Sequence, residues 1–492
     1  MKNSKNIYQY RHLVQITLEA KTPIAISSGE RDFITDAVIL KDINGLPYIP
    51  GTSIAGVIRH GIGHKKSNDL FGYNDRKKPE DSIGSNIIFS NALMIGKDGK
   101  VIEGLQQIDF INDDFYNYFL ALPIRQHNSI NSKGTVRTDG GKFDEQVVYK
   151  GTRYLFEIEL LSSEAEDKNL NNIINFIHSD EFRIGSGTRI GFGQMEVITC
   201  KQRSLNIKEE KDLEAYINKS SSLNNNDFWA NIESESPKVT QATNWDKYKL
   251  SLTPDDFFLF GSGFGSDDAD MTPVRESIII WEDGKPQFKD AQILIPASSI
   301  KGAISHRVAY HYNRLEGVHA DIIFDELKSK LEEENLSDRE FNKKLKEQYE
   351  KVVGENNTAV RELFGASGMQ DDTKQERGNV LFSDLFIDNK EVKEKILNHV
   401  SIDRFTGGAI DGALFQEEVV FGENVTFTLD IMVNKLEEAQ NKKIYSENVI
   451  NAFEATLTDI TNGMLPLGGG VNRGHGSFSG TITCNDKPLK LN

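Results

Sequence analysis

The chain has 492 residues, about three times a typical single domain of roughly 150, so two or three domains are expected. Hydrophobic residues make up 38% and charged residues 27%, which excludes a largely disordered chain. The net charge of −17 argues at first against a nucleic-acid binder, whose affinity rests on neutralising phosphates. The sequence shows no secretory pattern and no long apolar run, so we expect a cytoplasmic protein that does not bind a membrane. Cys200 and Cys484 alone predict neither a zinc site nor a disulfide framework.

The first half opens with a strand in which Val14, Ile16, Leu18 and Ala20 alternate with polar residues, typical of a sheet with one wet face. A helix is predicted after IPGTSIAG at 49–56, with Ser53 as its cap. The elements expected next are strands at 86–90 and 154–160, a helix at 169–178, a glycine-rich block at 185–193 and a closing strand.

The second half repeats this order. IPGTSIAG recurs as IPASSIKG at 295–302, with Ser299 in place of Ser53. The other matched blocks are LFG 70–72 with LFG 363–365, NIIFS 86–90 with NVLFS 379–383, VVY 147–149 with VVF 419–421, and GSGTRIGFG 185–193 with GGGVNRGHG 468–476. Because five blocks recur in the same order, we interpret the chain as a tandem duplication.

The repeat sets the predicted boundaries. The first domain is 1–200, a polar Ser/Asn-rich linker is 201–246, and the second domain is 247–492. An insertion between Gly302 and Leu363 carries a charged helical pattern at about 314–360, which is either a solvated excursion or a partner-binding element. Mixed strands and helices predict an α+β sandwich in each copy.

The glycine-rich blocks are the first chemical signal. Glycines spaced i, i+2, i+6 and i+8 let the backbone approach an anionic ligand, and each block also carries one arginine. The residues concerned are Gly185, Gly187, Arg189, Gly468, Gly470 and Arg473. A strand follows each block, so a dinucleotide fold is disfavoured. The alternative is a pair of tight turns that bind nothing.

The helix starts are the second signal, because a helix N-terminus offers unpaired amides and a positive dipole to a phosphate. Cations lie on the first turns: Arg59 and His60 in one copy, and Lys301, His306 and Arg307 in the other.

An N-terminal strand, an Asp-bearing loop, the P-x-x-S-I-x-G helix start, SIDRFTGGAIDGALFQEEVVFG at 401–422 and a terminal glycine-rich loop together resemble the RAMP superfamily of CRISPR systems. The resemblance covers both copies. The chain is similar to backbone subunits of type III effector complexes, in particular the double-RAMP subunits of the type III-D branch. It implies two tandem RAMP domains, each a modified ferredoxin-like (RRM-like) fold with thumb or insertion elements. The first copy lacks the IDRxTG core, although Arg125, Lys133 and Arg137 keep the corresponding region basic.

The resemblance also implies a function: binding of guide RNA (crRNA) and cutting of complementary single-stranded target RNA beside a divalent metal ion, Mg²⁺ or Mn²⁺. The matching aspartate in the first copy is Asp36. In the second copy Asp267, Asp268 and Asp270 are candidates, and Asp270 fits best. Asp36 and Asp270 are the expected metal contacts, although the sequence alone establishes no ligand set.

The expected RNA contacts are the helix starts, the glycine blocks and two arginines of the central regions: Ser53, Arg59, His60, Arg125, Gly185, Gly187, Arg189, Ser299, Lys301, His306, Arg307, Arg404, Gly468, Gly470 and Arg473. Expected protein partners are other RAMP subunits and the large subunit of the complex. Two alternatives remain, a non-catalytic guide-binding scaffold and a guide-processing nuclease that would use His60 or His306. Residues 1–200 hold 23 Lys and Arg against 25 Asp and Glu, so the acidity lies mainly after the first copy and does not exclude RNA.

Overall fold

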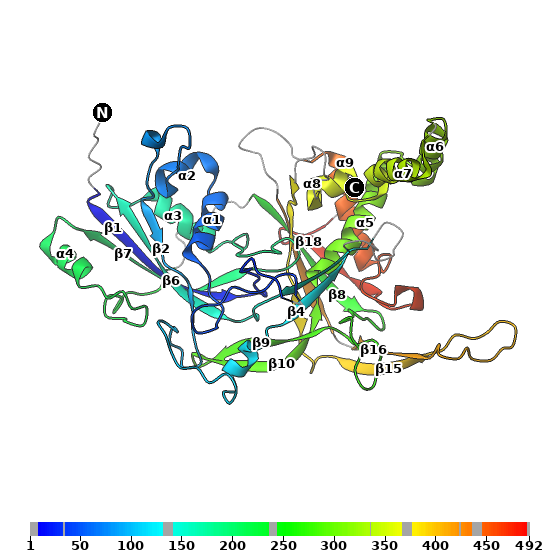
Figure 1. Ribbon diagram of the computed structural model, residues 1–492, viewed down its shortest axis with the longest axis horizontal. Helices are drawn as coiled ribbons and strands as arrows, with labels where there is room; N and C mark the ends of the chain where they lie inside the picture. The colour runs from blue at the N-terminus through cyan, green and yellow to red at the C-terminus, as the bar shows by residue number, and fades with distance from the viewer. Residues whose placement is uncertain are drawn as a thin grey trace.

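The structure is a computed structural model that describes residues 8–32, 35–130, 141–235, 244–334, 336–366, 376–422, 425–434 and 445–489 (Figure 1). Two mixed halves lie side by side, each built on an antiparallel sheet with helices packed against it. This arrangement confirms the predicted α+β architecture with two ferredoxin-like domains. Lys133 and Arg137 lie outside the described residues.

The first half is centred on β1 (Tyr10–Ala20), in a sheet ordered β2-β6-β1-β7 with β3 pairing β6. The other strands are β2 (Ile87–Phe89), β3 (Leu93–Met94), β6 (Arg153–Ser162) and β7 (Met195–Asn206). The helices are α1 (Gly51–Gly61), α2 (His64–Phe71) and α3 (Lys168–Ile177), with short 3₁₀ turns η1 (Pro79–Asp81) and η2 (Tyr116–Phe119). Ile16 and Leu18 of β1 share a buried core with Ile54 and Ile58 of α1 because apolar residues recur every second position on the strand and at i, i+4 on the helix.

The second half repeats this plan around β8 (Trp245–Pro254), in a sheet ordered β13-β17-β8-β18-β19. Its other strands are β13 (Val380–Phe382), β17 (Phe427–Asn434), β18 (Phe478–Cys484) and β19 (Lys487–Pro488). Helices α5 (Ala297–Leu315), α8 (Thr358–Phe364) and α9 (Glu447–Thr461) pack with it, and a smaller sheet contains β9 (Arg275–Glu282), β10 (Lys285–Ile295) and β14 (Leu385–Ile387). Two short strands, β11 (Gly365–Ala366) and β12 (Glu376–Arg377), pair with each other.

The insertion folds as predicted into helices, α6 (Ala320–Glu332) and α7 (Asp338–Val353), which extend from the upper right of Figure 1. Ser337 begins α7 with a reciprocal capping box to Glu340, a local signal for a helix start. No helix in the described ranges is long and apolar enough to cross a membrane.

Each half also has a separate two-stranded hairpin. In the first it is β4 (Ile124–Asn128) with β5 (Lys142–Gln146), and in the second β15 (Lys393–His399) with β16 (Phe415–Phe421). The β15–β16 hairpin projects from the body at the lower right of Figure 1.

Hydrogen bonds shared by the two halves fix the repeat residue by residue. The amide of Gly51 donates to Asn91 Oδ1 at 3.0 Å, and the amide of Ala297 donates to Asp384 Oδ1 at 2.8 Å. The same correspondence holds for the repeated blocks and for the two hairpins, so residues at matching positions of these segments can be compared.

These two bonds correct the predicted caps. The N-caps of α1 and α5 are Pro50 and Pro296, and neither helix has a side-chain cap from its own first turn. Ser53 and Ser299 lie inside the first turn because each helix begins directly after its proline. The first amide of each helix is held by a side chain from a distant loop.

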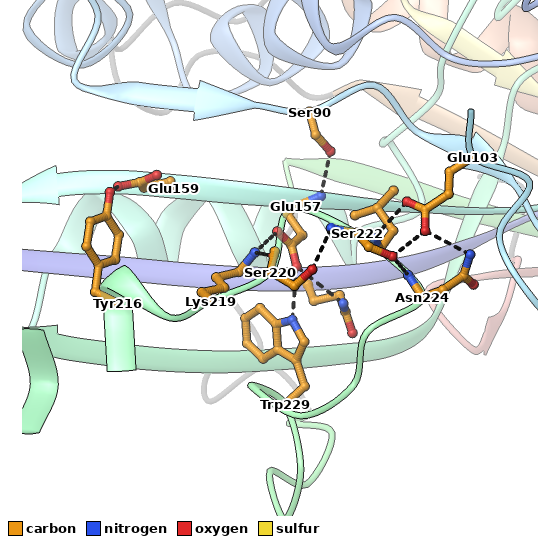
Figure 2. Close-up of polar contacts among 12 residues, drawn as sticks. Ser90, Glu103, Glu157, Glu159, Tyr216, Lys219, Ser220, Ser222, Asn224 and Trp229 are labelled. Carbon is orange, nitrogen blue, oxygen red and sulfur yellow. Dashed lines mark hydrogen bonds and ion pairs between the residues drawn. The ribbon is translucent and has the colours of Figure 1, made fainter. Parts of the chain in front are cut away.

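The structure differs from the sequence prediction at the linker. Residues through Asn206 continue β7, residues Glu210–Ile217 form α4, and Trp229 is 1% exposed. The Trp229 indole donates to Glu157 on β6, and Ser222 and Asn224 bond Glu103 (Figure 2). Ser and Asn serve here as specific hydrogen-bonding groups, which composition alone cannot distinguish from a flexible tether.

This covering segment also explains why β1 lacks the predicted wet face. Gln15 and Thr17 are 5% and 7% exposed. Gln15 bonds Glu157, which also accepts from Trp229 and from Lys219 at 2.6 Å. Buried polar groups are stable when they are paired in this way.

Candidate nucleic-acid interface and cleavage sites

Asp36 and Asp270 occupy equivalent positions beside the two hairpins. The amide of Asp36 donates to the Asp144 carbonyl at 2.9 Å, and Asp36 Oδ2 accepts the Asp144 amide at 3.1 Å. Asp270 makes the same pair with Gln416, at 2.9 and 2.8 Å. The geometry therefore identifies Asp270 as the counterpart of Asp36.

Asp267 and Asp268 lie in the preceding turn instead. The amides of Asp268 and Ala269 donate to Ser266 Oγ, so the backbone closes on itself there. Both aspartates are exposed, and neither makes with a hairpin the pair of hydrogen bonds that Asp36 makes with Asp144.

The donor set at Asp36 and Asp270 suits a cation shared with a bound polymer. Both carboxylates are exposed, and the amide bond occupies one oxygen of each. Within the described ranges no three His, Cys, Asp or Glu side chains gather as a metal site. Mg²⁺ commonly takes one or two carboxylates and completes its shell with water and substrate phosphates, so a single aspartate fits that role.

Beside Asp270, a buried carboxylate holds the hairpin against the glycine-rich loop. Glu417 is 0% exposed and accepts hydrogen bonds from Arg473 at 2.5 and 3.2 Å. His399 Nε2 and His475 Nε2 lie 2.7 and 2.9 Å from Glu417 Oε1. Burial opposes ionisation, but the bonds from Arg473, His475 and His399 outweigh it and lower the pKa of Glu417 to about 2.

Glu417→Gln should therefore destabilise the protein in a pH-dependent way. A depressed carboxyl pKa stabilises the folded state above the unfolded pKa of about 4.3, and this stabilisation is lost as pH falls towards about 2. The gap in thermal midpoint between wild type and Glu417→Gln should be widest above pH of about 5 and close on acidification. A gap that stays constant over that range would contradict the assignment.

The first half has a simpler version of this cluster. Glu145, at the position equivalent to Glu417, lies 3.0 Å from His127 Nε2, the counterpart of His399. Ile190 and Phe192 replace Arg473 and His475, so the first carboxylate has fewer cationic partners.

The glycine-rich loops use their amides within the chain. The amide of Ser186 donates to the Ala25 carbonyl, and that of Gly469 donates to Leu259. Gly187 and Gly470 have positive φ, 65° and 70°, and side chains there would overlap Phe192 and His475. Gly185 and Gly468 abut the Ala25 and Leu259 carbonyls. These glycines permit close approach of the chain to itself, and the amides of Ser186 and Gly469 are already bonded within the chain. Contact of Gly185, Gly187, Gly468 and Gly470 with RNA stays a prediction.

Gly476→Ala should destabilise the second half strongly, because φ is 78° and the added Cβ would overlap the Leu467 carbonyl. Gly302→Ala is the matched control. Gly302 lies inside α5 with open space around it, where alanine should gain up to about 1 kcal/mol. Thermal unfolding should move the two midpoints in opposite directions.

The glycine-rich loop of the first half meets the start of α5 in the second, and cations gather there. Burial and the charges of Arg377 and Arg183 lower the pKa of Arg189 to about 9. Burial and Arg189 also lower the pKa of Lys301. Four cations, Arg183, Arg189, Lys301 and Arg377, thus form a seam between the halves, which we call the cationic seam. Its mutual repulsion would be relieved by an anion.

Two of the seam arginines also join the halves. Arg183 donates to the Phe382 carbonyl and to Ser383 Oγ, and Arg189 Nε donates to the Gly378 carbonyl at 2.7 Å.

Arg125 is not available to RNA. It is 6% exposed, with its Nε 2.6 Å from Glu276 and Nη2 3.2 Å from Asp384, both in the second half. Burial alone would lower the pKa of Arg125, but attraction to the two carboxylates outweighs it and raises that pKa. Arg125 is a buried link between the halves.

The remaining candidates divide by exposure. His60 and His306 are exposed at equivalent positions of α1 and α5, and Ser299 is also exposed. Arg59 donates to Asn68, and Arg307 is paired with Asp459 at 2.6 Å. Arg473 is engaged with Glu417.

The tip of the β15–β16 hairpin carries exposed apolar side chains. Phe405 is 99% exposed, Leu414 65% and Ile402 61%, and Arg404 is exposed between two of them. Asp403 accepts from the Phe405 amide and Thr406 Oγ1, which shapes the turn in IDRFTG. An unburied phenylalanine on a formed turn can insert into a partner.

Sequence reasoning missed Glu417, Arg183 and Arg377. Glu417 lies two positions before the buried Val419, on the same face of the strand FQEEVVF, so a charged residue on that face is a signal of pairing. Arg183 directly precedes a glycine-rich block, but its partners come from the other half and no local pattern reveals them.

Comparison with known proteins bears on both halves. A family model described as the RAMP superfamily matches residues 17–196 and 258–479. No curated protein matches the chain significantly. The two matched regions coincide with the two repeats and confirm the resemblance in the sequence. Membership implies a CRISPR-associated RNA-binding subunit whose partners are RNA and other subunits of a CRISPR complex. The chain belongs to the RAMP superfamily, with one RAMP region in each half.

Proposed function

We propose that the chain is a guide-RNA-binding backbone subunit of a type III CRISPR effector complex, a double-RAMP fusion of the type III-D kind, and that it cuts complementary target RNA at Asp36 and Asp270. The cleavage proposal rests on one observation. At equivalent positions of the two halves, the carboxylates of Asp36 and Asp270 each accept a hydrogen bond from a main-chain amide of the neighbouring hairpin.

Guide binding is supported by the members of the cationic seam that reach the surface, since Arg377 is exposed and Arg189 and Lys301 are half-buried. RNA phosphates would compensate the charges of Arg189 and Lys301, whose pKa values are lowered mainly by burial and further by neighbouring cations. His60, His306 and Ser299, exposed on α1 and α5, extend this surface. Because the acidic insertion α6–α7 extends from one side, the overall negative charge need not oppose RNA at the seam.

Target spacing is supported by the hairpin tip. Phe405 and Ile402 offer an apolar wedge and Arg404 a cation, a combination suited to separating stacked bases and contacting a phosphate. Asp270 is bonded to Gln416 of the same hairpin, and the tip would space the target strand relative to this carboxylate.

Each aspartate has a defined chemical role. The hydrogen bond that the carboxylate accepts from the hairpin amide fixes its position, and Asp36 and Asp270 are the residues that would hold Mg²⁺ or Mn²⁺. A divalent ion bound there would supply positive charge to stabilise the negative charge that develops in the transition state. The adjacent 2′-hydroxyl would attack the phosphorus and form a 2′,3′-cyclic phosphate as the bond to the 5′-oxygen breaks. The 2′-hydroxyl releases its proton to solvent and the leaving 5′-oxygen takes one up, and the protein's contribution is to align the attacking and leaving oxygens.

The decisive observation is the RNA that copurifies with the assembled complex, sequenced at its ends. Guides of defined length support a backbone subunit. The scaffold alternative retains guide binding and yields no metal-dependent cut in added complementary RNA. The processing alternative predicts that the isolated chain cuts precursor guide without metal and that His60→Ala or His306→Ala abolishes it.

A further inference from the structure

A histidine and a glutamate form a pair beside each of the two candidate cleavage sites. In the second half His399 Nε2 lies 2.7 Å from Glu417 Oε1, and in the first half His127 Nε2 lies 3.0 Å from Glu145 Oε1. Each histidine is on the first strand of its hairpin and each glutamate is on the second strand. The two halves therefore share both residue types and the same ring nitrogen against the carboxylate.

The hairpin register places each histidine next to the contact that fixes the aspartate. In β15–β16, His399 belongs to the residue pair adjacent to that of Gln416, whose amide donates to the aspartate of the second site. In β4–β5, His127 has the same relation to Asp144, whose amide donates to the aspartate of the first site. Neighbouring pairs are roughly 3.4 Å apart along an antiparallel strand, so the histidine and the aspartate are held at adjacent positions of one hairpin.

The carboxylate determines which nitrogen of each imidazole can accept a proton. A carboxylate only accepts hydrogen bonds, so the Nε2 that faces it carries the proton and the lone pair of the neutral ring is on Nδ1. In the described part of the chain, Nδ1 of His127 and of His399 has no hydrogen-bond partner. Their side chains are 19% and 25% exposed, so both imidazoles reach the surface.

A second imidazole on Glu417 differs in both respects. His475 Nε2 lies 2.9 Å from the same carboxylate, but its side chain is only 6% exposed. Its counterpart in the first half is Phe192, which carries no ring nitrogen. Of the two imidazoles on Glu417, the partly exposed one is therefore kept in both halves and the buried one is not.

Charged side chains surround each imidazole, and each of them is paired within the chain. Those near His399 are Glu417, Arg473 and His475. Those near His127 are Glu145, Arg125 and Asp384. Because the arginines are neutralised by carboxylates, they do not prevent the imidazoles from taking up a proton.

We propose that His127 and His399 are the general bases of the two cuts, a role that rests on the proposed function. Nδ1 takes the proton of the 2′-hydroxyl as the 2′-oxygen bonds to phosphorus and the bond from phosphorus to the 5′-oxygen breaks. The leaving 5′-oxygen takes up a proton from solvent. The imidazolium, stabilised by Glu145 or Glu417, returns its proton to solvent, and the products are a 2′,3′-cyclic phosphate and a 5′-hydroxyl.

The test measures single-turnover cutting of end-labelled complementary RNA by the assembled complex. His399→Ala should slow the cut that Asp270→Asn removes, on the order of a hundredfold or more, and leave the cut at Asp36 unchanged. His127→Ala should do the reverse. Imidazole added to the buffer should restore part of the lost rate, because it can enter the space left by the side chain and take the proton. A side chain that only supports the hairpin would not be replaced in this way.

His475→Phe is the matched control at the same carboxylate. It copies Phe192 of the first half, so the cut at Asp270 should keep its wild-type rate and its dependence on pH. In the wild type this rate should fall on acidification, because a protonated imidazole cannot accept the proton of the 2′-hydroxyl. His399→Ala should lose this dependence.

The outcomes separate the general-base role from the proposed function. A wild-type complex that binds guide RNA and makes no cut would remove both. If the wild type cuts, unchanged rates in His127→Ala and His399→Ala would overturn the general-base role alone. The same conclusion would follow from a lost cut that imidazole does not restore in a variant that thermal unfolding shows to be folded.

Discussion

Replacing both Asp36 and Asp270 with asparagine should abolish target RNA cutting while guide binding persists. Metal-assisted charge stabilisation is worth several kcal/mol, so each single variant should slow its own cut on the order of a hundredfold or more and leave the other intact. Asparagine keeps the oxygen that accepts the Asp144 or Gln416 amide and removes only the charge. The assay is cleavage of end-labelled complementary RNA by the assembled complex with Mg²⁺ or Mn²⁺.

The second half offers internal controls for this experiment. Asp267→Asn and Asp268→Asn alter exposed carboxylates three and two residues before Asp270, and complexes that carry them should cut target RNA at the wild-type rate. Persistence of every cut in the Asp36→Asn, Asp270→Asn double variant would reduce the protein to a guide-binding scaffold. Loss of cutting with Asp268→Asn alone would move the second site.

Arg125→Ala should produce the largest loss of stability. It leaves two buried carboxylates, Glu276 and Asp384, without the guanidinium between them, and breaking such a buried pair costs about 3–5 kcal/mol. Burial already raises the pKa of both carboxyl groups despite Arg125, so they should take up protons in the variant. Thermal unfolding should show a midpoint lower by several degrees, with partial recovery as pH falls.

Arg404→Ala is the control for this loss. Arg404 is exposed on the hairpin tip, where a substitution normally changes stability by about 0.5 kcal/mol or less. If Arg125→Ala unfolds at the same temperature as Arg404→Ala, the buried link does not hold the halves together.

The duplication and the individual helices could be predicted because their signals are local. The strand and helix periods of 14–20 and 169–178, and the recurrence of IPxxSIxG, depend only on neighbouring residues. For Asp270, the spacing that resembles the family favoured this position, and the hydrogen bonds with Gln416 make it the counterpart of Asp36; its role in cleavage stays a prediction.

Contacts between distant segments could not be predicted. Arg125 looked like an RNA ligand because a cation in sequence shows no partner, yet its partners, Glu276 and Asp384, lie in the other half. Trp229 looked like part of a linker because its partner, Glu157, is 72 residues away. The glycines of 185–193 pointed to a ligand. Glycine is required wherever the backbone approaches another group closely, and the sequence does not show whether that group is a phosphate or a carbonyl of the chain itself.

Because the two halves are joined in one chain, a residue of the first half can be substituted without changing its counterpart in the second half. In a row built from many copies of one gene product, a substitution alters every copy at once. Here Phe192 and His475 stand at matching places beside Glu145 and Glu417, and one can change while the other is kept. Because one gene encodes both halves, two adjacent domains can therefore acquire different side chains at matching positions without a second gene.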